Sequence, residues 1–394
     1  MPKYTKVIIT GGTSVLNKGN YLDKKIPEIV EIAQQADKKE IDINSALNKC
    51  INYNYNINHE DMKKISAEFS MLNELKNNNY LDEDFNVSII HTDTVRGIIS
   101  ANINKKIIEK YFNTRVKLIQ ADNIDVTDNV KLRRNLGDFM NKLTCELLYA
   151  GNEYAFFAPI GGYKIMTYLA YIVGSFYRYD TGYLYEETQK LIKIPPVPIE
   201  INVERILSKK ELLKKMINDD NDIIKFSDLN DNDKEFIEQN SFFFEIVNDD
   251  NDNLVCLNAF GKFICEDYLT TKKLLSKNVI TLLDDKNYKN LIENNLFKLI
   301  TMIKKFYKDG DKEKDILGTI MHNKDWGINF PYLYKPKSRT NKEIFRCLWD
   351  YDVNEDEIKI YEIWLDHSKY EKDMNLIKSR KGYNTDVELI EFEI

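Results

Sequence analysis

Cysteine is sparse in this sequence, and long apolar runs are missing from it. Five cysteines are scattered over 394 residues, and no two of them form a CxxC pair. Such spacing argues against a disulfide framework and a clustered zinc site, and it fits a reducing compartment. No stretch approaches the roughly 18 apolar residues that a membrane span needs. The first residues lack the apolar segment of a signal peptide, so we expect a cytoplasmic protein without a membrane partner.

Positive charge is not in excess either. The net charge is −7, which excludes a uniformly basic nucleic-acid binder and leaves only a local basic patch for that role. A chain of 394 residues is longer than one compact core usually covers, so we expect more than one domain.

Short apolar runs alternate with helical stretches over the first half of the chain. The predicted strands cover residues 6–10, 87–91, 116–120 and 154–158. The predicted helices cover residues 27–35, 60–76, 104–112, 129–149 and 163–177. Residues 183–185 and 189–193 predict a closing hairpin. This alternation predicts an α/β fold with a mostly parallel sheet that is covered on both faces.

The proline-rich segment 194–198 is the clearest boundary, because consecutive prolines cannot continue a helix or a central strand. Beyond it, the pattern predicts helices at 203–217 and 231–239, a strand at 242–247, and then a strand, a turn at Gly261 and a helix over 254–268. A helix at 289–308 precedes predicted strands at 332–337, 344–351, 358–365 and 387–392. We therefore predict three domains: an α/β domain (1–195), a winged-helix-like connector (196–290) and a small antiparallel α+β domain (291–394).

Polar loops follow the strands of the first domain. Ligands of open parallel sheets bind beyond the carboxyl ends of the strands, where these loops should meet. The candidate ligand-binding residues are Gly12, Thr13, Ser14, Asn17, Thr92, Asp93, Asn123, Gly161, Gly162, Tyr163 and Lys164. Glycines and helix N-termini accommodate phosphate, and short polar side chains bind sugar hydroxyls. No GxGxxG follows the first strand, so a dinucleotide site is poorly supported.

Three segments carry a resemblance to a known family. The run VIITGGTSVLNKG resembles the opening strand and loop of CRISPR-associated Rossmann-fold (CARF) domains. The run AFFAPIGGYKIMTYLAYIVG resembles a later strand, loop and helix of that family, and LYEETQKLIKIPPVPIEIN resembles its hairpin and proline-rich exit. The resemblance implies a Rossmann-like sheet and a homodimer that binds a cyclic oligoadenylate, a second messenger of type III CRISPR complexes. We expect the tetra-adenylate ring as activator and no cofactor.

The later loop departs from the family pattern at two positions. Ile160 replaces the usual threonine, and Tyr163 replaces the usual phenylalanine. In some relatives the matching serine and lysine also cleave the ring. The resemblance therefore makes Ser14 and Lys164 candidates for an additional ring nuclease activity.

A basic segment lies in the last domain. Residues 335–346 hold five cations, and Glu343 is the single acid among them. A solvated edge strand protected by lysines would have the same composition. Lys335 and Lys337, however, are two positions apart and would share one face of a strand.

This segment resembles RelE-type messenger-RNA interferases. The matching runs are YKPKSR (334–339), FR (345–346) and HSKY (367–370). The resemblance implies metal-free RNA cleavage, in which a ribose 2′-hydroxyl attacks the adjacent phosphate. The implied catalytic residues are Lys335, Lys337, Arg339, Arg346, His367 and Tyr370.

The implied roles follow from the chemistry of these side chains. Lys335 or Lys337 would be the base if neighbouring cations depress its pKa, and Arg346 would stabilise the phosphate. His367 would protonate the leaving oxygen, and Tyr370 or Tyr334 would stack on an RNA base. Interferases of this type usually cut messenger RNA in the ribosome, which makes the ribosome a partner beside RNA.

Other outputs remain open. The HEPN ribonuclease, a common CARF partner, needs a histidine four to six residues after an arginine, and no arginine here has one. A metal-dependent PD-(D/E)xK nuclease could use Asp350, Glu357 and Lys359. A transcription regulator could use the winged-helix-like module, although residues 218–230 and 248–253 are acidic where DNA binding requires basic residues.

Overall fold

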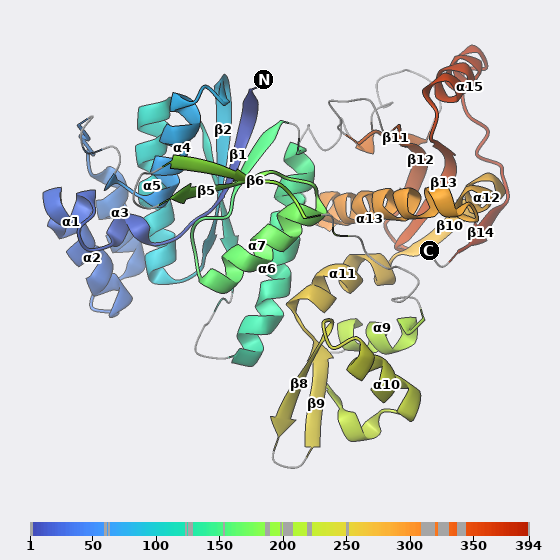
Figure 1. Cartoon of the computed structure of the whole chain (residues 1–394), viewed down its shortest axis with the longest axis horizontal. Helices are drawn as coiled ribbons and strands as arrows, with labels where there is room; N and C mark the ends of the chain where they lie inside the picture. Colours follow the sequence, from blue (N-terminus) through green and yellow to red (C-terminus); the bar gives the residue numbers. More distant parts are fainter. Residues whose placement is uncertain are drawn as a thin grey trace. The chain divides into compact units, whose positions relative to one another are not determined.

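The computed structural model describes residues 3–58, 61, 64–122, 124, 129–152, 154–185, 190–197, 199, 208–218, 223–249, 252–308, 320–321, 331–336 and 344–392. The chain divides into two compact units, Met1–Ile199 and Glu200–Ile394. Figure 1 shows the course of the chain through both. The proline-rich segment lies at this division.

The first unit is built on a six-stranded sheet with the order β3-β2-β1-β4-β5-β6. Its strands are β1 (Tyr4–Thr10), β2 (Leu81–Thr92), β3 (Val116–Ala121), β4 (Ala155–Ala158), β5 (Thr181–Tyr185) and β6 (Lys190–Ile194). Strands β1 to β5 are parallel, and β6 closes the sheet as the antiparallel partner of β5. The predicted α/β class, the mostly parallel sheet and the hairpin are confirmed. This strand order is the one found in doubly wound sheets.

Helices cover both faces of this sheet. They are α1 (Tyr21–Lys25), α2 (Pro27–Asp37), α3 (Ile43–Asn52), α4 (Ala67–Asn77), α5 (Val95–Phe112), α6 (Asn129–Ala150) and α7 (Lys164–Phe176), with the 3-10 turn η1 (Ser14–Leu16) after β1. Helices α5 and α6 lie on opposite faces (Figure 1). Two helices begin elsewhere than predicted. Ser66 caps α4 by accepting from the Phe69 amide, and Thr94 caps α5 by accepting from the Gly97 amide.

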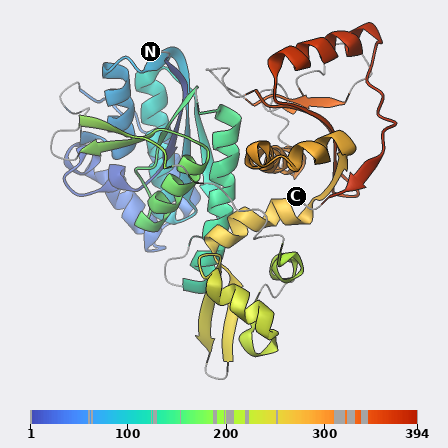
Figure 2. The same ribbon diagram turned by 45° about the vertical axis from the view of Figure 1, so that its right-hand side comes forward.

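The second unit starts with a helix-and-wing module. Its elements are α9 (Lys210–Asn218), β7 (Ile224–Lys225), η3 (Phe226–Asp228), α10 (Asp231–Gln239), β8 (Phe244–Asp249), β9 (Asp252–Leu257) and α11 (Ala259–Thr270). The strands form a small antiparallel sheet in the order β7-β9-β8, and Figure 2 shows its hairpin in yellow. The predicted turn at Gly261 is wrong. Gly261 lies in the first turn of α11, and Asn258 caps that helix by accepting from the Phe260 and Gly261 amides.

A five-stranded sheet follows in the order β11-β12-β13-β10-β14. Its strands are β10 (Lys272–Ser276), β11 (Tyr332–Tyr334), β12 (Arg346–Asp352), β13 (Glu357–Trp364) and β14 (Leu389–Glu391). The helices of this part of the chain are α12 (Lys277–Leu283), α13 (Lys286–Lys308) and α15 (His367–Ser379). The predicted antiparallel arrangement of β11, β12 and β13 is confirmed. Because β10 pairs in parallel with β13, however, the sheet is mixed rather than purely antiparallel.

The domain boundary predicted at 290/291 does not coincide with a break in this unit. It falls inside α13, and the sheet beyond it takes β10 from residues that were expected in the connector. Leu275 of β10 is fully buried beside Ile360 of β13, so the strand is held by core packing that a five-residue segment does not reveal.

Candidate functional sites

The two glycine loops of the first unit lie against each other. Gly12 follows β1, and Gly161 follows β4. A Cβ atom on Gly161 would lie 2.4 Å from the Gly12 nitrogen and 2.5 Å from the Thr10 oxygen, so only glycine permits this contact. The Gly161 amide also donates to the Thr10 hydroxyl (3.2 Å). The structure therefore brings together two of the loops that the sequence singles out.

The later loop leads directly into α7. Gly162 has a φ of +91°, a conformation that glycine adopts without strain. Tyr163 is the N-cap residue without a side-chain capping bond, and Lys164 is the exposed first residue of the helix. Backbone amides and one lysine thus gather at this helix start, an arrangement that favours an anion.

Ser14 in the first loop is bound to a buried carboxylate. Glu68, in the first turn of α4, is fully buried. Its Oε1 accepts from the Gly12 amide (2.7 Å), and its Oε2 accepts from the Ser14 hydroxyl (3.0 Å). The Ser14 oxygen in turn accepts from the Ala67 amide (3.0 Å). Sequence reasoning missed Glu68, because its contact with Ser14 spans 54 positions and no local pattern indicates it.

The loop after β2 is bonded within itself and to the segment that follows β3. The Thr92 and Thr94 hydroxyls lie 2.8 Å apart, and the Asp93 carboxylate accepts from the Ile124 amide (3.3 Å). His91 before them is buried, and burial lowers its pKa. Thr13 is half-buried as the N-cap of η1, and Asn17 is its exposed C-cap. Asn123 lies outside the described residues.

The second candidate site is centred on Arg346. This residue opens β12 opposite Trp364, the last residue of β13, and it is only 8% exposed. Its Nη1 donates to the Phe345 oxygen (2.7 Å). Its Nε has no hydrogen-bond partner within the described part of the chain. Burial lowers the pKa of Arg346, but a guanidinium stays charged in proteins, so this is a buried cation with an unused donor.

Helix α15 places further side chains beside Arg346. Asp366 caps the helix by accepting from the Lys369 amide (2.7 Å). The Tyr370 ring lies 5.8 Å from the Arg346 guanidinium carbon, and the His367 ring lies 6.3 Å from the Tyr370 ring, nearly parallel to it. Glu371, which sequence reasoning missed, has its Oε1 3.9 Å from His367 Nε2.

Both tyrosines that were expected to stack on RNA are buried. Tyr370 is 8% exposed and packs against Trp364, while Tyr334 is 2% exposed. Burial raises the pKa of both phenols. Neither ring therefore presents a face to a base, and Tyr370 instead supports the Arg346 guanidinium through a cation–π contact.

Lys335 comes directly after β11, which ends at Tyr334 rather than at residue 337. Partial burial and then the charge of Arg346 lower the pKa of Lys335, while Glu371 opposes this shift. Lys337 and Arg339 lie outside the described residues. The structure thus brings Lys335, Arg346, His367 and Tyr370 to one end of the β11-β12-β13 sheet.

The residues of the metal-dependent alternative also share a face. Asp350 pairs across the sheet with Lys359, two positions from Glu357. The Glu357 carboxylate is already compensated by Lys272 (3.0 Å) and Lys359 (3.5 Å). Across the described ranges, no three His, Cys, Asp or Glu side chains cluster as a metal site would require.

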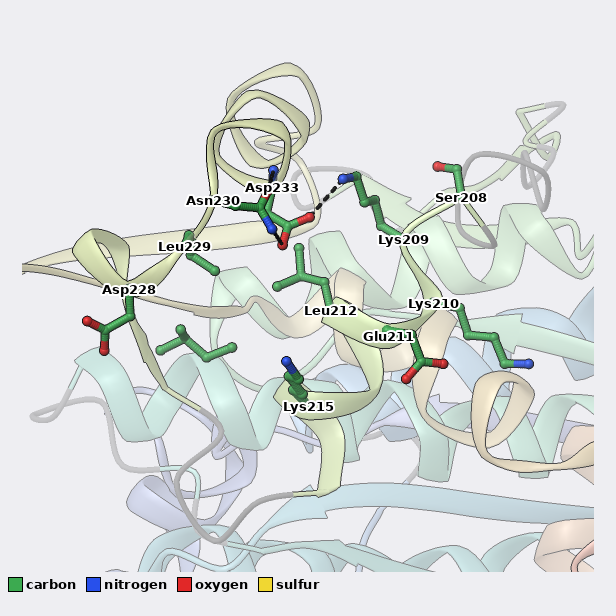
Figure 3. Close-up of a pocket in the computed structure, with 11 residues that line it drawn as sticks. Ser208, Lys209, Lys210, Glu211, Leu212, Lys215, Asp228, Leu229, Asn230 and Asp233 are labelled. Carbon is green, nitrogen blue, oxygen red and sulfur yellow. Dashed lines mark hydrogen bonds and ion pairs between the residues drawn. The ribbon is translucent and has the colours of Figure 1, made fainter.

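A groove of 690 Å³ lies in the helix-and-wing module, between α9 and the segment from β7 to α10 (Figure 3). Lys209 and Asp233 form an ion pair across it (2.7 Å), and Leu212 and Leu229 line it with apolar surface. Its charged lining is divided: three lysines and Glu211 lie on the α9 side, and Asp228 and Asp233 lie on the opposite side. Helix α10 itself carries Asp231, Asp233, Glu235 and Glu238 against one lysine, which disfavours contact with DNA phosphates.

One family model matches part of the chain. Residues 63–197 match the model of a family described as CRISPR-associated protein (Cas_APE2256). The matched part runs from just before α4 to the proline-rich segment, so it includes Glu68 and the Gly161 loop. No curated protein matches the chain. The match supports a CRISPR-associated protein. None of the described helices is long and apolar enough to cross a membrane.

Proposed function

We propose that this protein is a ligand-activated ribonuclease of type III CRISPR defence. The first unit would bind a cyclic oligoadenylate, and the second would cut RNA without a metal ion. The family match supports the CRISPR association. The ribonuclease assignment is carried by one observation: Arg346 is a buried cation whose Nε has no partner in the described structure. A phosphate would supply the missing acceptor.

The proposed ring site lies where the glycine loops meet. A ring phosphate would bind at the start of α7, near Gly162 and Lys164, where backbone amides and a cation favour negative charge. Ring nuclease activity by Ser14 and Lys164 remains a prediction.

The proposed homodimer has support from exposed apolar side chains near this site. Helix α7 exposes Ile165 (41%) and Tyr168 (66%). The β5-β6 hairpin exposes Tyr183 and Ile192 (both 44%), which are register partners and therefore share one face. Apolar surface of this kind commonly marks a contact with another protein chain. A second copy contacting through α7 would place two ring sites near a common two-fold axis.

The cleavage chemistry uses groups that the second unit brings together. Neutral Lys335 takes the proton of a ribose 2′-hydroxyl, and that oxygen attacks the adjacent phosphorus. The bond from phosphorus to the 5′-oxygen breaks, and His367 gives this leaving oxygen a proton. The products are a 2′,3′-cyclic phosphate and a 5′-hydroxyl. Arg346 stabilises the charge that grows on the phosphate oxygens.

The test is incubation of the full chain with RNA, with and without ribosomes, and with each cyclic oligoadenylate in turn. We expect cleavage that requires a ring, with the tetra-adenylate ring most effective, and products that end in a 2′,3′-cyclic phosphate. Enhancement by ribosomes would identify the ribosome as a partner. Absence of cleavage under every condition would refute the ribonuclease assignment.

A metal-dependent nuclease is the second candidate, because Asp350, Glu357 and Lys359 share one face of β12 and β13. The rate of RNA cleavage in EDTA distinguishes the two mechanisms.

A further inference from the structure

Glu68 changes what the first glycine loop can offer to a ligand. Its carboxylate accepts from the Gly12 amide at 2.7 Å and from the Ser14 hydroxyl at 3.0 Å. A serine hydroxyl has one hydrogen and two acceptor lone pairs. The hydrogen of Ser14 is used by Glu68, and one lone pair is used by the Ala67 amide. What remains on the half-buried Ser14 is a single acceptor site.

This arrangement disfavours phosphate at Ser14. A phosphate diester oxygen has no hydrogen to donate, and it would approach a hydroxyl whose hydrogen is held by a buried carboxylate. Glu68 has two hydrogen-bond donors but no ion-pair partner among the described residues, so its carboxylate would repel a second negative charge placed beside it. The group that binds Ser14 must therefore be a hydrogen-bond donor.

A cyclic oligoadenylate has two kinds of donor, the ribose 2′-hydroxyl and the adenine amino group. The position of the loop distinguishes them. Gly12 and Gly161 are in backbone contact, so Ser14 lies close to the start of α7, where the ring phosphate would bind. In a nucleotide the 2′-hydroxyl is next to the 3′-phosphate, whereas the amino group is at the far edge of the base.

We propose that Ser14, polarised by Glu68, is the acceptor for a ribose 2′-hydroxyl, and that this pair makes the sensor selective for ribonucleotide rings over deoxyribonucleotide rings. The proposal rests on ring binding by the first unit. It assigns to Glu68 the role of a positioning residue, because Glu68 acts through the hydroxyl of Ser14 rather than by touching the ring.

The substitution Glu68→Gln reverses the hydrogen bond. The glutamine oxygen can still accept from the Gly12 amide, but its amide nitrogen then donates to the Ser14 oxygen. Both lone pairs of Ser14 are occupied in that variant, and its hydrogen turns outward. Ser14 becomes a donor. A 2′-hydroxyl can still bind it through its own oxygen, but a 2′-fluorine can accept as well, so the preference over the 2′-fluoro ring should fall.

The experiment measures binding of four rings by calorimetry: cyclic tetra-adenylate, its 2′-deoxy and 2′-fluoro forms, and a ring whose bases lack the amino group. The unchanged protein should bind the 2′-deoxy and 2′-fluoro rings at least about 10-fold more weakly, as expected for loss of a hydrogen bond to a charge-linked acceptor. The 2′-fluoro ring separates hydrogen bonding from sugar pucker. Removal of the adenine amino groups should not change the contribution of Ser14 to ring affinity.

Two variants and one control complete the test. Ser14→Ala should reduce the preference over both the 2′-deoxy and the 2′-fluoro ring to within about 2-fold, and Glu68→Gln should reduce the preference over the 2′-fluoro ring. Glu74→Gln on the same helix should retain the full preference. Should Glu68→Gln unfold, Ser14→Ala and the unmodified protein still decide the question.

Each outcome has one meaning. Equal binding of the ribose and 2′-deoxy rings by the unchanged protein overturns the inference and leaves the proposed function standing. A preference over the 2′-deoxy ring that survives Ser14→Ala also overturns it. If removal of the amino group weakens binding by the unchanged protein but not by Ser14→Ala, Ser14 contacts the base instead. Failure of every ring to bind removes the sensor function, and the inference with it.

Discussion

The two candidate sites differ in how completely their polar groups are paired. In the first unit, Ser14, Glu68 and Gly12 satisfy one another, and the Thr92 loop is bonded within itself. In the second unit, Arg346 is buried while its Nε has no partner in the described structure. Buried polar groups are usually paired, so the unpaired Nε of this buried cation supports the proposed contact with a phosphate. The polar groups of the first loop therefore satisfy one another within the chain, whereas Arg346 Nε at the second site has no partner in the described structure.

The two sites also differ in the sign of their charge. The first glycine loop binds the carboxylate of Glu68, so a phosphate of the proposed ring is expected at the later loop instead. The second site combines Lys335 and Arg346, and their mutual repulsion contributes to the lowered pKa of the lysine. The first site therefore holds a buried carboxylate, whereas the second brings two cations together.

Removal of Arg346 gives the largest expected effect. Arg346→Ala should slow single-turnover RNA cleavage by roughly two to three orders of magnitude, because one transition-state donor is lost. Arg346→Lys should recover only part of the rate, since an ammonium cannot reproduce the guanidinium fork. Ring binding should not change. Arg380→Ala, which removes an exposed arginine at the end of α15, is the matched control. If Arg346→Ala cleaves RNA at a rate within a few-fold of the unchanged protein, Arg346 is not a catalytic residue.

Lys164 tests the first site. Lys164→Ala should weaken ring binding by about 10-fold, the effect of one charged hydrogen bond, without changing the unfolding temperature, because the side chain is exposed. Calorimetry and thermal unfolding measure the two quantities. Lys24→Ala, at an exposed position of α1, is the control. If Lys164→Ala binds every ring with unchanged affinity, the N-terminus of α7 does not contact the ligand.

Glu371 tests how neighbouring charges set the pKa of Lys335. Its negative charge raises the pKa of Lys335, so Glu371→Gln should lower that pKa further. Cleavage that needs neutral Lys335 rises with pH through this pKa, and its rising limb should therefore move to lower pH. We expect a shift below about one pH unit, because solvent and salt screen this exposed charge. Glu355→Gln is the control. If the rising limb of the pH–rate profile of Glu371→Gln moves to higher pH, Lys335 is not the base.

Chelation should have the smallest effect. Cleavage through Lys335, Arg346 and His367 needs no divalent ion, so EDTA should leave the rate unchanged. A rate abolished by EDTA and restored by magnesium or manganese would instead favour the site of Asp350, Glu357 and Lys359.

The two halves of the chain were predictable to different degrees. In the first half each apolar run became a strand of the parallel sheet, because burial on both faces leaves a continuous apolar signal. In the second half, β10 was missed, since its five residues carry no distinctive period and gain their burial from β13. The strand expected over 332–337 ends at Tyr334.

By itself, the sequence determined the alternation of strands and helices, the proline-rich boundary, the glycine loops and the basic segment, because each is encoded in neighbouring residues. Only the tertiary structure decided which polar groups are free. Glu68 is 54 residues from Ser14, and Tyr370 is far along the chain from Arg346, yet these contacts determine the donor and acceptor state of each site. Hydrogen-bond pairing and burial depend on such long-range contacts, and no local pattern of residues records them.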